Sequence, residues 1–253
     1  MIVPAKLKIF KNFLYLAWKH LHLPPPTKIQ YDMADFLQYG PKRSCVQAFR
    51  GAGKSWITSA FACWNWLMDP QKNILVVSAS KTRADDFSTF TQRLIHELPI
   101  LEHLKPRDDQ RSSKVSFDVG PARASHAPSC KSMGITSQLT GSRADLIIAD
   151  DVESANNSQT QLMRDRLSET IKEFDSIIKP EVGRILFLGT PQTELSIYNQ
   201  LEERGFKTQI WPARFPDAKA ITNYGRKLAT SIIENADKLK AGDALDPKRF
   251  DDV

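Results

Sequence analysis

The sequence contains little cysteine: Cys45, Cys63 and Cys130 are the only three among 253 residues. They are widely spaced, form no CxxC motif and have no pair of histidines nearby. This arrangement argues against a zinc site and against a disulfide framework. Unpaired cysteines are typical of reducing compartments, so we expect an intracellular protein.

A long hydrophobic run is also missing. Residues 9–23 are largely apolar but are interrupted by Lys11, Lys19 and His20, which leaves the segment too short and too charged to span a bilayer. No small-residue cleavage site follows it, so we expect no signal peptide. The sequence therefore predicts a soluble protein without a membrane partner.

Acidic residues are scarce in the first 60 positions, which carry nine lysines and arginines against two aspartates, a net charge of +7. The whole chain has a net charge of +6, so the remainder is close to neutral. Such an asymmetry suits a polyanionic partner, either a nucleotide or a nucleic acid. A solvated helix face explains Lys6, Lys8 and Lys11 equally well.

Apolar runs that resemble strands alternate with segments of helical periodicity from residue 44 onward. The predicted strands are Ser44–Phe49, Asn73–Ser78, Leu146–Ala149 and Arg184–Leu188. Helices are predicted over residues 54–68, 81–98, 158–178 and 194–204, after two N-terminal helices within residues 1–40. This alternation indicates an α/β fold with a mostly parallel central sheet covered by helices. Residues 105–145, rich in proline, serine and glycine, predict a β-rich insertion or long loops.

Residues 47–55 read Gln-Ala-Phe-Arg-Gly-Ala-Gly-Lys-Ser and lie between a predicted strand and a predicted helix. A strand, a glycine loop and a helix N-terminus together hold phosphates through inward-turned backbone N–H groups. Lys54 is placed to neutralise the β- and γ-phosphates, and the Ser55 hydroxyl to ligate Mg²⁺. Ala48 stands where such loops usually have their first glycine, so a glycine-rich turn before an ordinary helix is the alternative.

A cluster of carboxylates, Asp150, Asp151 and Glu153, follows the predicted strand Leu146–Ala149. A buried parallel strand that ends in an acid presents this acid beside the glycine loop. Asp150 would complete a Mg²⁺ site with Ser55, because Mg²⁺ prefers oxygen ligands. A second carboxylate can orient the attacking water; position favours Asp151, and Glu153 stays open. A polar helix cap after a core strand is the alternative.

The predicted strand Arg184–Leu188 ends in small and polar residues, Gly189-Thr190-Pro191-Gln192. Thr190 or Gln192 is placed there to sense a γ-phosphate. A plain turn into the next helix explains the pattern equally well. Ser78-Ala79-Ser80-Lys81, after the strand Asn73–Ser78, is a weaker instance of the same arrangement.

Four segments, in order, resemble the large terminase subunit of short-tailed podoviruses. They are residues 47–55, 74–81 (Ile-Leu-x-Val-Ser-Ala-Ser-Lys), 138–153 (Gln-Leu-Thr-Gly-Ser-Arg-Ala-Asp-x-Ile-Ile-Ala-Asp-Asp-Val-Glu) and 188–194 (Leu-Gly-Thr-Pro-Gln-Thr-Glu). The likeness extends from about Leu14 to Phe250. It implies an additional-strand, RecA-like P-loop ATPase domain over residues 1–240 and the start of a linker over residues 241–253. We expect this chain to lack the nuclease domain that follows in this family, so the resemblance implies ATP hydrolysis without DNA cleavage.

The resemblance also implies roles for individual residues. Lys54, Ser55, Gly51, Ala52 and Gly53 match the phosphate-binding motif, and Arg50 the basic residue inside it. Asp150 with Asp151 matches the second motif, where many terminases have Asp-Glu. Gly189-Thr190-Pro191 resembles the segment that couples hydrolysis to movement.

Two further residues are assigned by the same resemblance. Gln30 resembles the upstream glutamine that reads adenine, and an exposed helix position is its alternative. Arg143 is the candidate arginine finger for a neighbouring subunit, and a salt bridge to Asp145 or Glu153 is its alternative.

The implied function is ATP- and Mg²⁺-dependent translocation of double-stranded DNA into a viral procapsid. The implied partners are DNA, the portal protein, the small terminase subunit and further copies of the chain in a ring, a pentamer by resemblance, in the host cytoplasm. Lys105, Arg107, Arg111, Lys114 and Lys131 are candidates for gripping DNA. The alternatives are a nucleotide-gated DNA-binding adaptor, a helicase-type P-loop ATPase and a small-molecule kinase; the paired acids at 150 and 151 count against the kinase.

Overall fold

The computed structural model describes residues 3–139, 141–190 and 195–247, and within them seven strands form one sheet in the order β3-β4-β2-β5-β6-β1-β7. The strands are β1 (Arg43–Ala48), β2 (Ile74–Ser78), β3 (Ser116–Phe117), β4 (Cys130–Gly134), β5 (Leu146–Asp150), β6 (Arg184–Gly189) and β7 (Lys207–Trp211). Every pairing is parallel except that of β3 with β4. The mostly parallel sheet is confirmed, and each of the four predicted strands is present to within one residue at either end.

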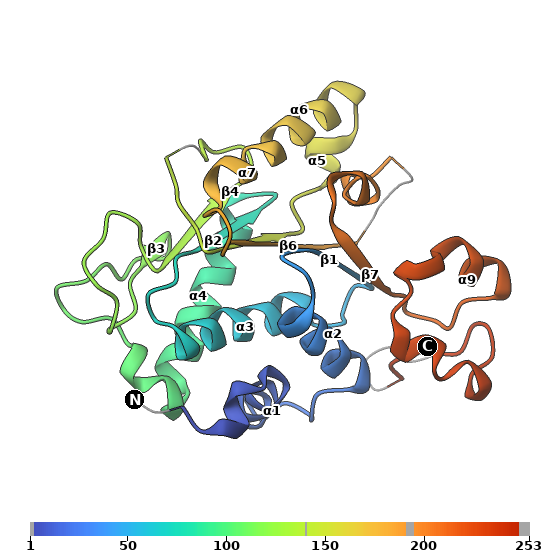
Figure 1. Ribbon diagram of the computed structural model, residues 1–253, viewed down its shortest axis with the longest axis horizontal. Helices are drawn as coiled ribbons and strands as arrows, with labels where there is room; N and C mark the ends of the chain where they lie inside the picture. The colour runs from blue at the N-terminus through green and yellow to red at the C-terminus, as the bar shows by residue number, and fades with distance from the viewer. Residues whose placement is uncertain (1–2, 140, 191–194, 248–253) are drawn as a thin grey trace.

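Helices cover both faces of this sheet (Figure 1). One face carries α1 (Phe10–His20), α2 (Lys28–Tyr39), α3 (Lys54–Met68) and α4 (Lys81–Glu97). The other carries α5 (Ala155–Ser158), α6 (Gln161–Lys172) and α7 (Phe174–Ile177). The remaining helices are α8 (Ile197–Gln200), α9 (Ala218–Tyr224) and α10 (Thr230–Ile233), with short 3-10 turns at Ala5–Lys8, Pro99–Leu104, Glu202–Arg204, Gly225–Lys227 and Ala236–Lys238.

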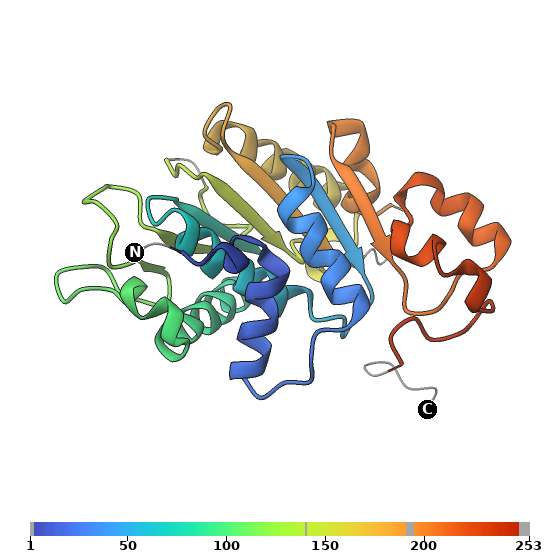
Figure 2. The same ribbon diagram turned by 60° about the horizontal axis from the view of Figure 1, so that its bottom comes forward.

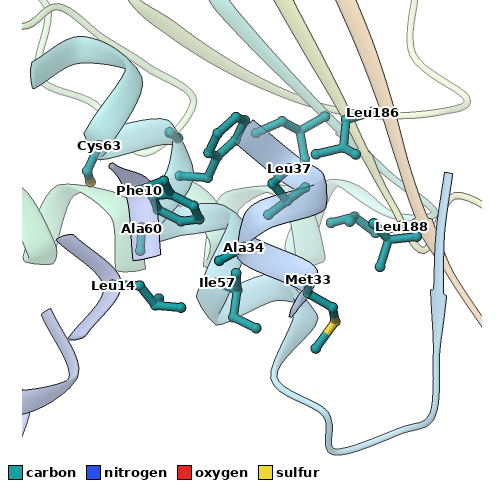
Figure 3. Close-up of a cluster of buried hydrophobic side chains, with 14 of the residues drawn as sticks. Phe10, Leu14, Met33, Ala34, Leu37, Ile57, Ala60, Cys63, Leu186 and Leu188 are labelled. Atoms are coloured by element: carbon teal, nitrogen blue, oxygen red, sulfur yellow. The ribbon is translucent and has the colours of Figure 1, made fainter. Parts of the chain in front are cut away.

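The alternation of side chains along the buried strands produces two hydrophobic cores. On β6, Leu186 and Leu188 point into the core beneath α1 to α3 (Figure 3), while Ile185 and Phe187 point into the core beneath α6 and α7. Because both faces of a strand are buried, its sequence is a continuous apolar run and not an alternating pattern. This is why β2, β5 and β6 were recognisable from sequence.

The N-terminal helices lie on the face of α3, as the turned view shows (Figure 2). Thr27 caps α2 in a capping box in which Gln30 bonds back to the Thr27 backbone N–H at 3.1 Å. Thr27 is therefore the N-cap of α2. Among the described residues, no helix is both long and apolar enough to cross a bilayer.

Three sequence predictions of regular structure were incomplete. The helix predicted over residues 158–178 is two helices, α6 and α7, and residue 158 is the last residue of α5. The break before α6 arises because Thr160 begins a new helix by accepting a hydrogen bond from the Met163 N–H. The helix predicted over 194–204 is α8 followed by a 3-10 turn, and residue 194 lies outside the described residues. No individual strand was predicted at β4 or β7, since their sequences, CKSMG and KTQIW, contain few apolar residues. β4 does lie within residues 105–145, for which a β-rich insertion or long loops were predicted.

The described residues after position 240 are packed against the domain. Ala244 forms an antiparallel bridge with Arg214, and the Leu245 N–H donates to the Ala213 carbonyl at 2.9 Å. Asp246 is buried and accepts a hydrogen bond of 2.6 Å from the Thr27 hydroxyl. A domain boundary at residue 240 stays a prediction, but residues 241–247 are anchored to the helix that carries Gln30.

Candidate active site

The loop between β1 and α3 has the geometry that its glycines predict. Gly51 and Gly53 have φ values of 95° and 86°, in the left-handed region that favours glycine, and α3 begins at Lys54. Residue 48, where an alanine replaces the usual glycine, is buried at the end of β1. The substitution therefore lies at the strand end, and the turn itself keeps both of its glycines.

Lys54 is buried and points into the loop. Its Nζ donates to the carbonyl oxygens of Ala48 at 2.8 Å and Phe49 at 3.3 Å, and to Oγ1 of Thr190 at 3.1 Å. Burial lowers the pKa of Lys54, and the carboxylates of Asp151 and Asp150 oppose this effect. These neutral acceptors satisfy the ammonium group only weakly, so an anionic phosphate would be a stronger partner.

The hydroxyl of Ser55 and the carboxylate of Asp150 meet at the carboxyl edge of the sheet, with Oγ donating to Oδ1 at 3.2 Å. The predicted convergence of the glycine loop with the acidic strand end is therefore present. Burial, followed by the charge of Asp151, raises the pKa of Asp150 to about 6. A buried carboxylate of this kind is stabilised by a nearby cation.

These two oxygen donors fit a Mg²⁺ ion. Mg²⁺ is commonly bound by one or two carboxylates together with substrate phosphates and water, which is the donor set that Ser55 and Asp150 leave room for. Within the described residues there is no group of three or more His, Cys, Asp or Glu side chains suited to a metal. The site therefore fits a metal that arrives with a phosphate ligand.

Asp151 and Glu153 have different environments. Asp151 has a φ of 44°, which is uncommon for a residue other than glycine. Its half-buried side chain lines a cavity next to the glycine loop. Backbone strain of this kind concentrates at functional sites. Glu153 is 8% exposed, and its Oε2 accepts hydrogen bonds from Ser196 Oγ at 2.7 Å and Ile197 N–H at 2.8 Å. Asp151 thus faces the cavity, whereas the carboxylate of Glu153 is engaged by two donors, and the choice between them as the group that orients water stays a prediction.

A cavity of about 910 Å³ surrounds these groups. Its volume is in the range of small-molecule and cofactor sites. The cavity brings together several residues predicted from sequence: Arg50, Gly51, Gly53, Lys54, Ser55, Asp151, Glu153 and Thr190. Ala52 is buried behind the loop, and Asp150 is buried beneath Ser55.

Two arginines that sequence reasoning missed also line the cavity. Arg83 is exposed in the first turn of α4, next to β2, and β2 pairs with β5 so that Ser78 lies beside Asp150. Arg164 on α6 is held by the carbonyl oxygens of Ser158 at 2.8 Å and Gln159 at 3.2 Å. The polar segment 78–81 at the end of β2 was the only feature of the sequence that pointed to the region near Arg83. No feature of the sequence indicated Arg164.

Gln30 is fully buried, so the exposed alternative for this residue is wrong. Its Oε1 accepts from the Thr27 N–H, and its Nε2 donates to the Ala52 carbonyl at 3.0 Å. Gln30 thus supports the phosphate loop from behind. Reading of adenine by Gln30 stays a prediction.

Arg143 lies apart from the cavity. It is exposed just before β5, at the opposite end of that strand from Asp150, and its Nη1 donates to the Ser176 carbonyl at 3.3 Å. Its expected rival partners are engaged elsewhere, since Asp145 pairs with Lys179 at 2.8 Å and Glu153 bonds to Ser196. In its own subunit Arg143 cannot reach the site, so any role as an arginine finger requires a second copy of the chain.

Most candidates for gripping DNA have partners within the chain. Arg111 pairs with Asp118 at 2.8 Å and also donates to the carbonyl oxygens of Ser125 and His126. Arg107 donates to the Gly120 carbonyl and to Asp109. Lys105 pairs with Glu102, and Lys131 donates to Ser142. Arg107 and Arg111 therefore stabilise the segment between residues 105 and 129.

The fold and the site together define a P-loop nucleotide-binding protein. Residues 47–177, about half of the chain, match the family model described as terminase large subunit, T4likevirus-type, N-terminal. The chain therefore belongs to the terminase large-subunit family.

Known relatives support this assignment. The large terminase subunit of Enterobacteria phage T3 is 50% identical over 258 aligned residues, which cover 99% of this chain and 44% of that protein. The chain thus spans less than half the length of this curated relative.

Two solved structures are similar in fold. A variant of Dbp5 from S. cerevisiae, bound to Nup159, Gle1, IP6 and ADP, matches 87% of this chain and 54% of its own at 13% identity and a TM-score of 0.51. A variant of the large terminase ATPase domain of Thermus phage P74-26 matches 72% of this chain and 71% of its own at 14% identity and a TM-score of 0.46. The first of these likenesses supports the RecA-like architecture of the sheet.

Proposed function

We propose that this chain hydrolyses ATP with Mg²⁺ and that the hydrolysis drives double-stranded DNA into a viral procapsid. The observation that carries the proposal is the contact of Ser55 with Asp150 beside the buried Lys54, at one edge of the sheet. Membership of the terminase family supplies the DNA-packaging context. The portal protein, the small terminase subunit, a ring of copies and the host cytoplasm follow from that context as part of the proposal.

The residues of the chain have distinct tasks in this reaction. Lys54 exchanges its carbonyl and Thr190 partners for the β- and γ-phosphates, and the loop N–H groups bind the remaining phosphate oxygens. Ser55 and Asp150 would hold Mg²⁺, which supplies charge neutralisation of the phosphates when bound. Asp151 accepts a hydrogen bond from the attacking water and orients it in line with the γ-phosphate.

Thr190 connects the site to the rest of the domain. In the described structure its hydroxyl joins Lys54 and the Ala48 carbonyl, to which it donates at 3.0 Å. When Lys54 turns to a phosphate, Thr190 loses this partner. The end of β6 thereby responds to the presence of nucleotide. This response is the coupling role that the sequence predicts for Gly189-Thr190-Pro191. Pro191 lies outside the described residues.

Release of phosphate from ATP by the purified chain tests the proposal. We expect Mg²⁺-dependent turnover that falls at least a hundredfold in Lys54→Ala. Lys172→Ala, at an exposed residue of α6 that pairs with Glu169, is the control and should retain turnover. Turnover that rises more than linearly with protein concentration would support a ring in which Arg143 of one copy acts on its neighbour. Turnover that does not depend on Lys54 would contradict the proposal, and binding of ATP without turnover would favour a nucleotide-gated adaptor.

A further inference from the structure

The carboxylate of Glu153 connects two segments of the chain through hydrogen bonds. Its Oε2 accepts from both the hydroxyl of Ser196 and the backbone N–H of Ile197, at 2.7 and 2.8 Å. Glu153 and Ser196 are both buried, at 8% and 0% exposed. The segment that begins at Ser196 is thus fixed to the segment that follows Asp151.

Tyr198, two residues beyond Ser196, contacts three strand ends. Its hydroxyl lies 3.5 Å from the Glu153 N–H, and its carbonyl accepts from the side chain of Gln47 on β1 at 3.4 Å. Its ring packs so closely on Gly189 that a Cβ at residue 189 would lie 2.2 Å from a ring carbon. Tyr198 therefore joins the ends of β1, β5 and β6, which carry the phosphate loop, Asp151 and Thr190.

We propose that Glu153 is a positioning residue, and that the Glu153 cluster (Glu153, Ser196, Ile197 and Tyr198) fixes the distance between Asp151 and Thr190. Glu153 then acts on ATP turnover through this packing and not by accepting a proton from water. The proposal rests on the proposed ATPase function and assigns Glu153 a role that differs from that of its neighbour Asp151. This positioning role requires an acceptor oxygen on the side chain of residue 153, but it does not require a negative charge there.

Replacement of Glu153 by glutamine and by alanine separates the two roles. Glu153→Gln keeps an oxygen that accepts from Ser196 and Ile197, whereas Glu153→Ala leaves both donors buried without it. We expect Glu153→Ala to lower kcat more than tenfold with KM nearly unchanged, and Glu153→Gln to restore kcat to within about fivefold of the original chain. Asp151→Asn, measured alongside, should lose about 10²–10⁴-fold, as removal of a general base does.

Two results would overturn the proposal while leaving the ATPase function intact. If Glu153→Gln is as inactive as Asp151→Asn, Glu153 acts through its charge as the base. If Glu153→Ala turns over ATP as the original chain does, the cluster does not position the site.

A second measurement tests the packing by Glu153 separately from the ATPase function, and it also serves if Glu153→Ala does not fold. Hydrogen exchange of the Ile197 and Tyr198 amides reports the packing directly. We expect protection in Glu153→Gln equal to that in the original chain, and loss of protection in Glu153→Ala or, where this variant is unfolded, in the milder Ser196→Ala. Unchanged protection in the truncated variant, or lost protection in Glu153→Gln, would overturn the proposal.

Discussion

Asp150 is buried, and the cost of its charge there makes the stability of the folded protein depend on pH. Its pKa of about 6 is above the ordinary value of 3.8, so the folded chain binds this proton more readily than the unfolded chain. The charged carboxylate therefore destabilises the nucleotide-free protein above pH 6, and this cost disappears as the pH falls through 6 toward 4. Asp150→Asn removes the charge and keeps an oxygen for Ser55.

We predict that Asp150→Asn is more stable than the original chain at pH 8, by on the order of 2 kcal/mol. The difference should shrink as the pH falls through 6 toward 4, because Asp150 itself becomes neutral in the folded chain. Thermal unfolding of both proteins across this range, without nucleotide or Mg²⁺, measures it. A variant that is less stable at pH 8, or a difference independent of pH, would contradict this account of the site.

Arg83 gives a second prediction at the scale of a single residue. Its guanidinium lines the cavity and is among the positive charges that oppose the burial-driven rise in the pKa of Asp150. We expect Arg83→Ala to weaken binding of a non-hydrolysable ATP analogue roughly tenfold or more, which corresponds to the loss of a charged hydrogen bond. Arg93→Ala, on the same helix but paired with Glu97 at the surface, is the matched control and should bind normally. Equal affinities in the two variants would exclude Arg83 from phosphate binding.

At the scale of elements, the N-terminus of α2 connects the phosphate loop with the C-terminal segment. Thr27 caps the helix and donates to Asp246, and Gln30 in the same turn donates to the Ala52 carbonyl. Removal of an N-cap hydroxyl typically costs about 1 kcal/mol. We predict that Thr27→Ala lowers Tm by roughly 2–4 °C and weakens nucleotide binding, whereas Thr27→Ser preserves both. Calorimetry and analogue titration check this, and a Thr27→Ala chain with unaltered affinity would show that the cap does not support the loop.

The elements also show where sequence was informative. The strands that flank the site are buried on both faces, so β2, β5 and β6 are runs of Ile, Leu and Val that cannot be mistaken for loops. The edge strand β7 has only Ile210 and Trp211 as large apolar residues and gave no comparable signal. Helix breaks such as the one at Thr160 depend on a local cap that competes with helical periodicity over the longer segment.

At the scale of the whole molecule, the convergence of the loop that carries Lys54 and Ser55 with Asp150 was predictable, because parallel strands present their carboxyl ends at one edge of a sheet. The positions of Arg83 and Arg164 at the cavity were not predictable from sequence. Arg83 reaches the cavity because of the order of the strands, and Arg164 because of the path of α6 across that edge. Spacing along the chain does not encode this order. The separate environments of Asp151 and Glu153 likewise depend on Ser196 and Tyr198, more than 40 residues away in sequence.

The net charge of +6, concentrated in the first 60 residues, bears on DNA binding by the whole molecule. Contacts to phosphates release counterions, so the affinity for duplex DNA should fall at least tenfold between 50 and 200 mM salt. Fluorescence anisotropy with two unrelated duplexes of equal length checks both the salt dependence and the expected indifference to sequence. An affinity that is constant over this range would contradict binding through the phosphate backbone.

The most direct test of the central claim is a crystal structure of the chain with Mg²⁺ and a non-hydrolysable ATP analogue. We predict that Lys54 Nζ leaves Thr190 and the Ala48 carbonyl for the β- and γ-phosphates, and that Ser55 and Asp150 lie on the metal side of the same triphosphate. Asp151, and not Glu153, should face the water in line with the γ-phosphate. A triphosphate bound elsewhere, or one that leaves Lys54 on Thr190 and Ala48, would contradict the account.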